Sequence, residues 1–114
     1  MSPIPDLLFA RCEPRRDAIA AAQLDTWLAQ VPGWMPDPDR KLIARRFGFE
    51  NFYQVMAFVD AVAEIAHAQD HHPEMLVGYS ACTVSYSTHS AGGLTANDFI
   101  CAAQVSALPE ATGE

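Results

Sequence analysis

A long amphipathic helix is predicted over residues 51–69, because apolar side chains recur there every three or four positions. Asn51 precedes the pattern and is a favourable N-cap residue. The apolar positions of this segment are Phe52, Val55, Met56, Val59, Val62, Ala63 and Ala66. A helix with one apolar face depends for its stability on packing that face against another apolar surface, so the flanking segments must supply one.

Two pairs of strands are predicted around this helix. Residues 34–35 and 41–49 flank the turn-rich stretch 36–39, and together they predict a hairpin. After the helix, residues 75–79 and the alternating segment 82–89 read as two more strands joined by a short turn. An antiparallel pair of strands is therefore predicted both before and after the helix in the sequence.

A further helix is predicted at each end of the domain. Residues 17–31 have approximately helical apolar spacing, and the pattern stops before Pro32. Near the other end, Thr95 is placed as an N-cap and Asp98 as the third residue of a capping box, and this helix is expected to end near Leu108. The predicted order is helix, strand, strand, helix, strand, strand, helix.

This order favours an α+β fold in two layers, with three helices packed on one face of a four-stranded antiparallel sheet. The length of 114 residues suits one such domain. Residues 1–16 contain three prolines and no sustained period, so we expect a flexible leader there, followed by the domain over 17–109 and a short tail over 110–114.

Charge and composition exclude several classes of function. Fourteen acidic residues against seven basic ones give a net charge of −7, which repels nucleic acid and anionic membranes. No apolar run approaches the roughly 20 residues of a membrane span, and no signal core is evident, so we expect a cytoplasmic protein. The cysteines are three and form no CxxC pair, which argues against a disulfide framework or a cysteine zinc site.

The main functional clue is a cluster of histidines. His67, His71 and His72 fall within six residues, where the long helix meets the third strand. Histidine titrates near neutral pH, so neighbouring histidines can divide acid and base roles. Pro73 biases His72 toward an extended backbone. The alternative is a solvated helix end, where a protonated histidine interacts favourably with the helix dipole.

A zinc site is a rival interpretation of the same residues. His67 and His71 are four apart, a spacing that can place two imidazoles on one helical face, and Glu64, Asp70 or His89 could complete such a site. The helix is expected to end at or before His71, however, and the glutamate of an HExxH motif is absent. We therefore expect no metal.

Two more polar positions follow the last predicted strand. His89 ends the alternation of that strand, just before the turn that contains Gly92 and Gly93. It is either a surface histidine or part of a site where backbone groups are free to bind a polar ligand. The primary role predicted for Asp98 is in the capping box at the start of the last helix, and from there it can also face His89.

These residues together resemble a known family. The run His67-x3-His71-His72-Pro73-x5-Tyr79-x9-His89-x8-Asp98 is similar to the signature of the pterin-4a-carbinolamine dehydratase family, also called 4a-hydroxytetrahydrobiopterin dehydratases. The similarity covers roughly residues 24–108. It includes Gly33-Trp34, Phe47-x-Phe49-x-Asn51-Phe52, Ala63-Glu64, Ser87-Thr88-His89, Gly93-Leu94-Thr95 and Asn97-Asp98-Phe99. The general pattern looks like the bacterial branch associated with phenylalanine hydroxylase.

The resemblance implies both a fold and a reaction. The fold is a four-stranded antiparallel sheet with three helices, assembled as a homodimer or homotetramer. The reaction is the dehydration of 4a-hydroxytetrahydropterin to quinonoid dihydropterin, without metal or organic cofactor. It recycles the pterin of aromatic amino-acid hydroxylases. Loss of the 4a-hydroxyl needs a proton on the leaving oxygen and removal of the N5 proton.

The resemblance also implies roles for particular residues. His71, His72 and His89 match the active-site histidines, with acid and base work chiefly at His71 and His89. The residues expected to contact the pterin are His71, His72, Pro73, Thr88, His89, Ser90 and Ala91. His67 and Asp98 are expected to support the site, although position 67 is often glutamate in the family.

Two other kinds of function remain open. Some members of this family bind other proteins, so the chain could instead be a non-catalytic dimerisation, assembly or regulatory partner on the same fold. A metal-dependent hydrolase built on His67, His71 and His89 is a further alternative, and it predicts bound zinc.

Overall fold

The structure is a computed structural model that describes residues 4–112. Its main helices and strands follow one another in the predicted order. Residues 1–3 of the predicted leader and 113–114 of the predicted tail lie outside the described residues. The elements are η1 (Ala21–Gln23), α1 (Leu24–Leu28), β1 (Met35–Pro36), β2 (Ile43–Gly48), α2 (Phe52–Gln69), β3 (Glu74–Val77), β4 (Ala81–Tyr86), η2 (His89–Ala91), α3 (Ala96–Ser106) and η3 (Pro109–Thr112), where η marks a 3-10 helix.

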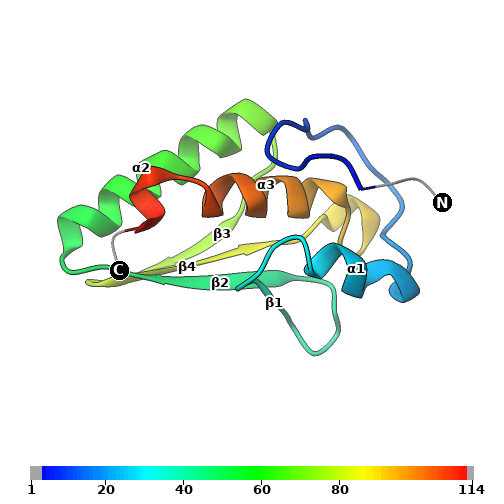
Figure 1. Ribbon diagram of the computed structural model, residues 1–114, viewed down its shortest axis with the longest axis horizontal. Helices are drawn as coiled ribbons and strands as arrows, with labels where there is room; N and C mark the ends of the chain where they lie inside the picture. The colour runs from blue at the N-terminus through cyan, green and yellow to red at the C-terminus, as the bar shows by residue number, and fades with distance from the viewer. Residues whose placement is uncertain (1–3, 113–114) are drawn as a thin grey trace.

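The strands form one antiparallel sheet in the order β1-β2-β4-β3. Helices α2 and α3 lie across one face of this sheet (Figure 1). The short helix α1 contacts α3, since the rings of Trp27 and Phe99 have centroids 5.4 Å apart. The predicted α+β fold of a four-stranded antiparallel sheet and three helices is confirmed.

The two central strands carry the apolar face of the sheet. In their register Ile43 lies opposite Tyr86 and Phe47 lies opposite Cys82, and all four side chains are buried. Side chains alternate between the two faces of a strand, so these residues share the face that the helices cover. The alternation read from the sequence therefore identifies the core side of β2 and β4.

Helix α2 covers this face through residues spaced by three and four positions. Its buried residues are Val55, Phe58, Val62 and Ala66. Phe58 contacts Phe47 of β2 with ring centroids 4.6 Å apart. Phe52 and Met56, which the predicted apolar face included, are instead 44% and 36% exposed.

No helix among residues 4–112 combines the length and apolarity that crossing a membrane requires.

The first helix is shorter than predicted because its first residues are used elsewhere. Residues 17–20 are not helical, and the amide of Ile19 donates to the carbonyl of Leu94 at 2.8 Å. Ala20, just before η1, has an extended backbone with φ of −60° and ψ of 139°, which interrupts any helix through this segment. The prediction of a helix from residue 17 was therefore wrong, and helical turns begin only at Ala21.

The last strand also ends earlier than predicted. Strand β4 stops at Tyr86, and Thr88 instead forms an isolated antiparallel bridge with Gly93. The reversal between them passes through Gly92, whose φ of +70° is a conformation that glycine adopts without steric cost. His89 consequently lies in η2 and not at the end of a strand.

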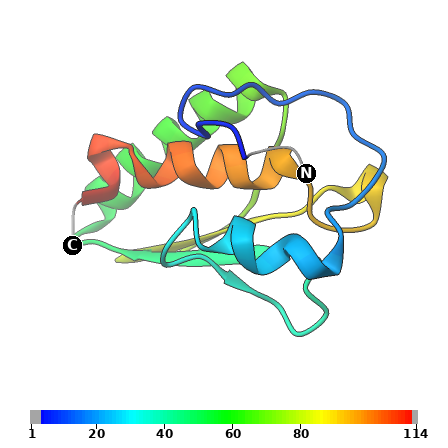
Figure 2. The same cartoon turned by 45° about the vertical axis from the view of Figure 1, so that its right-hand side comes forward.

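The described part of the N-terminal segment, residues 4–16, lies over the ends of α2 and α3 (Figure 2). Leu7 is buried in the core. The side-chain amide of Gln104 on α3 donates to the carbonyls of Leu7 at 3.4 Å and Ala10 at 3.3 Å. The segment is thus attached to the helical layer through both apolar and polar contacts.

The N-cap of α2 gives the first prediction. Asn51 Oδ1 accepts from the Gln54 amide at 2.9 Å, so Asn51→Ala should lower the free energy of unfolding by about 1 kcal/mol. The control Asn51→Asp keeps the acceptor and should remain close to wild type. Urea unfolding of the three proteins measures the effect. Equal stability of Asn51→Ala and wild type would contradict this role of the cap.

Candidate active site

The site is built around Asp98 at the start of α3. Asp98 is fully buried, and its Oδ2 accepts from the backbone amide of Thr95, the N-cap residue, at 2.9 Å. The Thr95 side chain in turn accepts from the first turn of the helix, so the predicted capping box is confirmed. A carboxylate here also interacts favourably with the positive end of the helix dipole.

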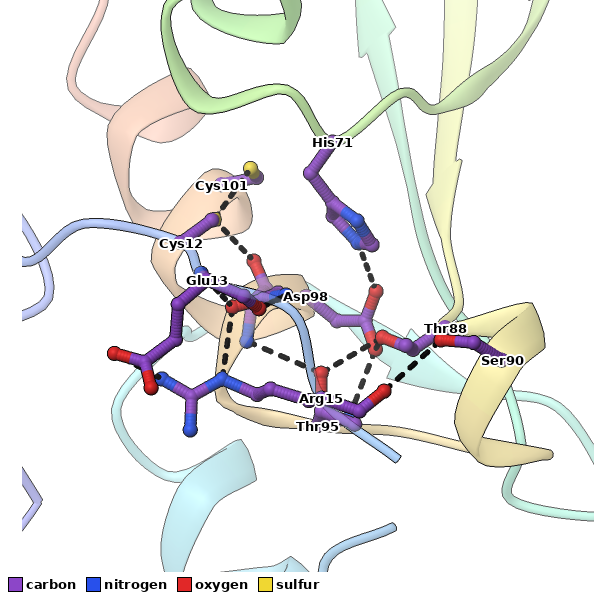
Figure 3. Close-up of polar contacts among 10 residues, drawn as sticks. Cys12, Glu13, Arg15, His71, Thr88, Ser90, Thr95, Asp98 and Cys101 are labelled. Atoms are coloured by element: carbon purple, nitrogen blue, oxygen red, sulfur yellow. Dashed lines mark hydrogen bonds and ion pairs between the residues drawn. The ribbon is translucent and has the colours of Figure 1, made fainter. Parts of the chain in front are cut away.

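The same carboxylate holds two residues from other parts of the chain. Its Oδ1 lies 2.6 Å from His71 Nε2, and its Oδ2 accepts from the Thr88 hydroxyl at 2.8 Å. The Thr88 and Thr95 hydroxyls lie 2.7 Å apart. Figure 3 shows His71 pointing toward Asp98 from the opposite side of this cluster. Asp98 therefore connects the α2–β3 junction, the segment between β4 and η2, and the start of α3.

The way α2 ends places His71 over this carboxylate. Asp70 caps the helix in the left-handed conformation, with φ of +51°. The His71 amide still donates to the carbonyl of Ala66, at 3.3 Å. The imidazole then stacks on Tyr86 of β4 at a centroid distance of 5.9 Å and an angle of 13°. Only 13% of the His71 side chain remains exposed.

This environment favours the protonated form of His71. Burial alone lowers the pKa of the imidazole, but the hydrogen bond and the negative charge of Asp98 outweigh it, with smaller contributions from Cys12 and Asp70. The net result is a pKa above the usual 6.5. His71 is therefore held as a proton donor at the edge of the core.

A cavity of about 360 Å³ opens beside His71. Ligand sites for small molecules begin at about 300 Å³, so the volume suits a compact ring system. The lining residues are Cys12, Glu13, Pro14, Arg15, Gln69, Asp70, His71, Thr88, Ser90 and Asn97. We refer to this cavity as the His71 pocket.

One wall of the His71 pocket is the N-terminal segment, and Asn97 holds it in place. Asn97 Oδ1 accepts from the Glu13 amide at 3.2 Å and from Arg15 Nε at 2.9 Å. Its Nδ2 donates to the Glu13 carbonyl at 2.7 Å. The Ser90 hydroxyl donates to the Arg15 carbonyl at 2.9 Å. Residues 13–15 are thus held against the first turn of α3.

The sequence interpretation missed this wall. Cys12, Glu13 and Arg15 lie in a segment to which it gave no chemical role. Asn97 appeared only as part of a family motif. The one usable signal is that Asn97 is a polar residue beside Asp98 in an otherwise apolar helix start, where a buried amide requires partners.

His89 lines a different cavity. This second cavity, of about 310 Å³, is bordered by Lys41, Ser87, Thr88, His89, Gly92 and Gly93. Thr88 borders both cavities, so they meet at that residue. The imidazole of His89 is exposed and is not part of the lining of the His71 pocket.

The remaining predicted site residues are spread around the His71 pocket. Ser90 lines it directly. His67 and His72 are exposed, while Pro73 and Ala91 are half-buried, and none of these four borders either cavity. The structure therefore brings His71, Thr88, Ser90 and Asp98 together and leaves the other histidines at the periphery.

Metal-ligating side chains do not gather in the described part of the chain. Among residues 4–112, no group of three or more His, Cys, Asp or Glu side chains is arranged to hold a metal ion. His67, His71 and His89, the set considered for a zinc hydrolase, form no such group.

Comparisons with known proteins agree on one family. A family model described as "Pterin 4 alpha carbinolamine dehydratase" matches residues 17–108. A protein of Stenotrophomonas maltophilia (strain R551-3), named "Putative pterin-4-alpha-carbinolamine dehydratase", is 47% identical over 113 residues, which are 96% of this chain and 97% of that protein.

Two solved structures have a similar fold. A crystal structure from Brucella melitensis, described as a "transcriptional coactivator/pterin dehydratase", has a TM-score of 0.76 at 30% identity and covers 80% of this chain and 97% of its own. A pterin dehydratase-like protein identified as a RuBisCO assembly factor of the alpha-carboxysome has a TM-score of 0.61 at 22% identity, covering 75% of this chain and 96% of its own. The second likeness concerns the fold alone.

The His71–Asp98 pair gives the second prediction. Asp98→Asn removes the negative charge but keeps an oxygen for the helix cap, so the pKa of His71 should fall. Asp70→Asn is the control, because Asp70 makes the smallest of the contributions that raise this pKa. NMR titration of the His71 imidazole protons measures both. An unchanged pKa in Asp98→Asn, or an equal fall in Asp70→Asn, would contradict the pairing.

The same pair predicts a pH-dependent stability. The pKa of His71 is raised in the folded protein, so protonated His71 contributes to the free energy of unfolding. This contribution is fully present below the unfolded pKa of about 6.5 and is lost as pH rises through the folded pKa. Asp98→Asn should remove this part of the pH dependence. A wild-type stability with no decline in that pH range would contradict the pairing.

Proposed function

Because the chain belongs to the pterin-4a-carbinolamine dehydratase family, we propose that it dehydrates 4a-hydroxytetrahydropterin to quinonoid dihydropterin in the His71 pocket. The observation that carries this proposal is the hydrogen bond of 2.6 Å between His71 and the buried Asp98 at the edge of a cavity large enough for a pterin ring. The reaction moves only protons and water, so positioned acid and base groups are the machinery it needs.

His71 acts as the general acid in this proposal. Its Nε2 is engaged by Asp98, so Nδ1 is the ring nitrogen left to exchange a proton with a ligand. A protonated imidazole donates that proton to the 4a-oxygen as the C4a–O bond breaks, and water leaves. Asp98 stabilises the protonated ring and fixes its orientation, which is the work of a positioning residue.

The N5 proton needs an acceptor on another side of the ring. We assign this role to His89, which borders the adjoining cavity and is separated from the His71 pocket by Thr88. A ligand that reaches across Thr88 would then lie between an acid and a base. His72 and Pro73 follow His71 directly and would orient the ring, while Ser90 and Ala91 would contact it from η2. His67 supports the helix end.

The wider setting is part of the same proposal. The substrate would be 4a-hydroxytetrahydrobiopterin or a close relative, and the enzyme, a hydro-lyase, would use no metal or organic cofactor. Its product feeds the recycling of the pterin that aromatic amino-acid hydroxylases consume, with phenylalanine hydroxylase as the associated enzyme. Such an enzyme would act in the cytoplasm.

An exposed apolar surface at one edge of the sheet supports a proposal of self-association. Strand β3 is an edge strand, and its Leu76 and Val77 are 75% and 40% exposed. Nearby, Phe52 at the start of α2 stacks on Tyr79 with ring centroids 6.4 Å apart, and Tyr79 is 75% exposed. An edge strand has one side whose backbone groups are not paired within the sheet, and with apolar side chains nearby this side can pair with the same strand of a second copy. We propose a homodimer, or a tetramer of such dimers, through this edge.

The catalytic proposal predicts a defined loss of activity. His71→Ala should lower the part of the dehydration rate that exceeds the spontaneous reaction by about 10²–10⁴-fold, since a positioned acid contributes that much. His89→Ala should lower it as well. The control is Asp60→Ala, because Asp60 is an exposed residue of α2 that borders neither cavity. The substrate is generated in situ by a phenylalanine hydroxylase, and its decay is followed by ultraviolet absorbance.

Full activity of a folded His71→Ala variant would contradict the assignment of His71. No acceleration by folded wild type would contradict the enzyme and favour the alternative of a non-catalytic partner protein. The relative from Brucella melitensis, described as a coactivator as well as a dehydratase, makes that alternative concrete.

The proposed dimer has its own test. Leu76→Lys places a charge in the middle of the edge strand and should shift wild-type dimers or tetramers toward monomers in analytical ultracentrifugation. Leu8→Lys is the matched control, because Leu8 is an exposed leucine of the N-terminal segment. Monomeric wild type at micromolar concentrations would overturn this interface.

A further inference from the structure

Two cysteines meet at the wall of the His71 pocket. Cys12 lies in the N-terminal segment and Cys101 on α3, and their sulfur atoms are 3.6 Å apart although 89 positions separate them in the sequence. Figure 3 shows the two side chains directed toward each other. A disulfide bond is about 2.05 Å long, so a modest approach of the sulfurs would join them.

The two thiols differ in access. Cys12 is half-buried and borders the cavity, so a small solute can reach it. Cys101 is fully buried and does not line the cavity. The third cysteine, Cys82, is also fully buried in β4. Only the pair therefore combines an accessible thiol with a second thiol in contact.

The position of Cys12 is fixed by its neighbours. Its amide donates to Gln69 Oε1 at 2.8 Å, and its sulfur lies 3.6 Å from the Asn97 carbonyl. These contacts hold the thiol against Cys101 without the need for a bond between them. A thiol that is already oriented toward its partner forms a disulfide with little further ordering of the chain.

The surroundings also activate one sulfur over the other. The hydrogen bond from Cys101 lowers the pKa of Cys12, with His71 and Arg15 assisting and burial opposing. The pKa of Cys101 is raised, first by this hydrogen bond and then by burial. The thiolate is the reactive form, so Cys12 is the sulfur that reacts first.

We propose that Cys12 and Cys101 are an oxidation site for hydroperoxides, and that their disulfide fixes the N-terminal segment as a permanent wall of the His71 pocket. The proposed dehydration uses neither sulfur, although Cys12 borders the same pocket. The chemistry of the oxidation site therefore stands or falls independently of the proposed enzyme activity.

The oxidation takes place in two balanced steps. The Cys12 thiolate attacks one oxygen of hydrogen peroxide, the O–O bond breaks, and the released hydroxide takes up the thiol proton as water. This leaves a sulfenic acid on Cys12. The Cys101 sulfur then attacks the Cys12 sulfur, the S–O bond breaks, and the departing hydroxide takes the Cys101 proton. Two thiols and one peroxide give one disulfide and two waters.

Treatment of the reduced chain with a few equivalents of hydrogen peroxide tests the proposal. Free thiols should fall from three to one per chain. Digestion before aspartate residues places Cys12, Cys82 and Cys101 on separate peptides, 6–16, 70–97 and 98–114, and the first and last of these should be joined until a reductant is added. Since the bond joins residues 89 positions apart and so closes a long loop, the midpoint of thermal unfolding should rise by about 10 °C and return on reduction.

Three variants make the result specific. Cys82→Ala should form the same disulfide as wild type. Cys12→Ser should keep both remaining thiols, because the buried sulfurs are not reached. Cys101→Ala should stop at a sulfenic acid that a dimedone probe labels on Cys12. Oxidation of Cys12 in wild type to a sulfinic acid or to a disulfide between two chains, without a bond to Cys101, would overturn the proposal. Equal oxidation of Cys82 would overturn it as well.

Discussion

The buried carboxylate of Asp98 is the interaction on which this arrangement depends. It closes the capping box of α3, accepts from Thr88 in the segment after β4 and pairs with His71 between α2 and β3. A buried charge is tolerated only when its hydrogen-bonding capacity is satisfied, and here three separate segments satisfy it. One residue therefore determines both how the domain closes at this end and where a protonated imidazole is held.

The neighbouring Asn97 extends the same logic to the N-terminal segment. Its side chain binds the backbone of Glu13 and the guanidinium of Arg15, which converts an otherwise open surface beside His71 into a pocket. Two adjacent residues in the first turn of α3 thus have different partners, since Asp98 pairs with His71 and Asn97 holds the N-terminal segment. The thiol contact between Cys12 and Cys101 lies one helical turn further along.

Local chemistry made much of this predictable from the sequence. Asn51 and the Thr95–Asp98 capping box depend on residues a few positions apart, and both were predicted correctly. The pairing of His71 with Asp98 joins residues 27 positions apart, and nothing in their spacing specifies it. The position of His89 was missed for a different reason, because a local bridge between Thr88 and Gly93 reverses the chain and ends the strand early.

The central claim is that His71, paired with Asp98, gives the proton that releases water from a pterin. The pH dependence of kcat/KM for dehydration, measured for wild type and Asp98→Asn, tests it most directly because it reports the pKa of the acid in the free enzyme. We expect activity to fall as pH rises through the raised pKa of His71, and the fall to shift to lower pH in Asp98→Asn. An alkaline limb that is absent, or that stays in place in the variant, would contradict the account.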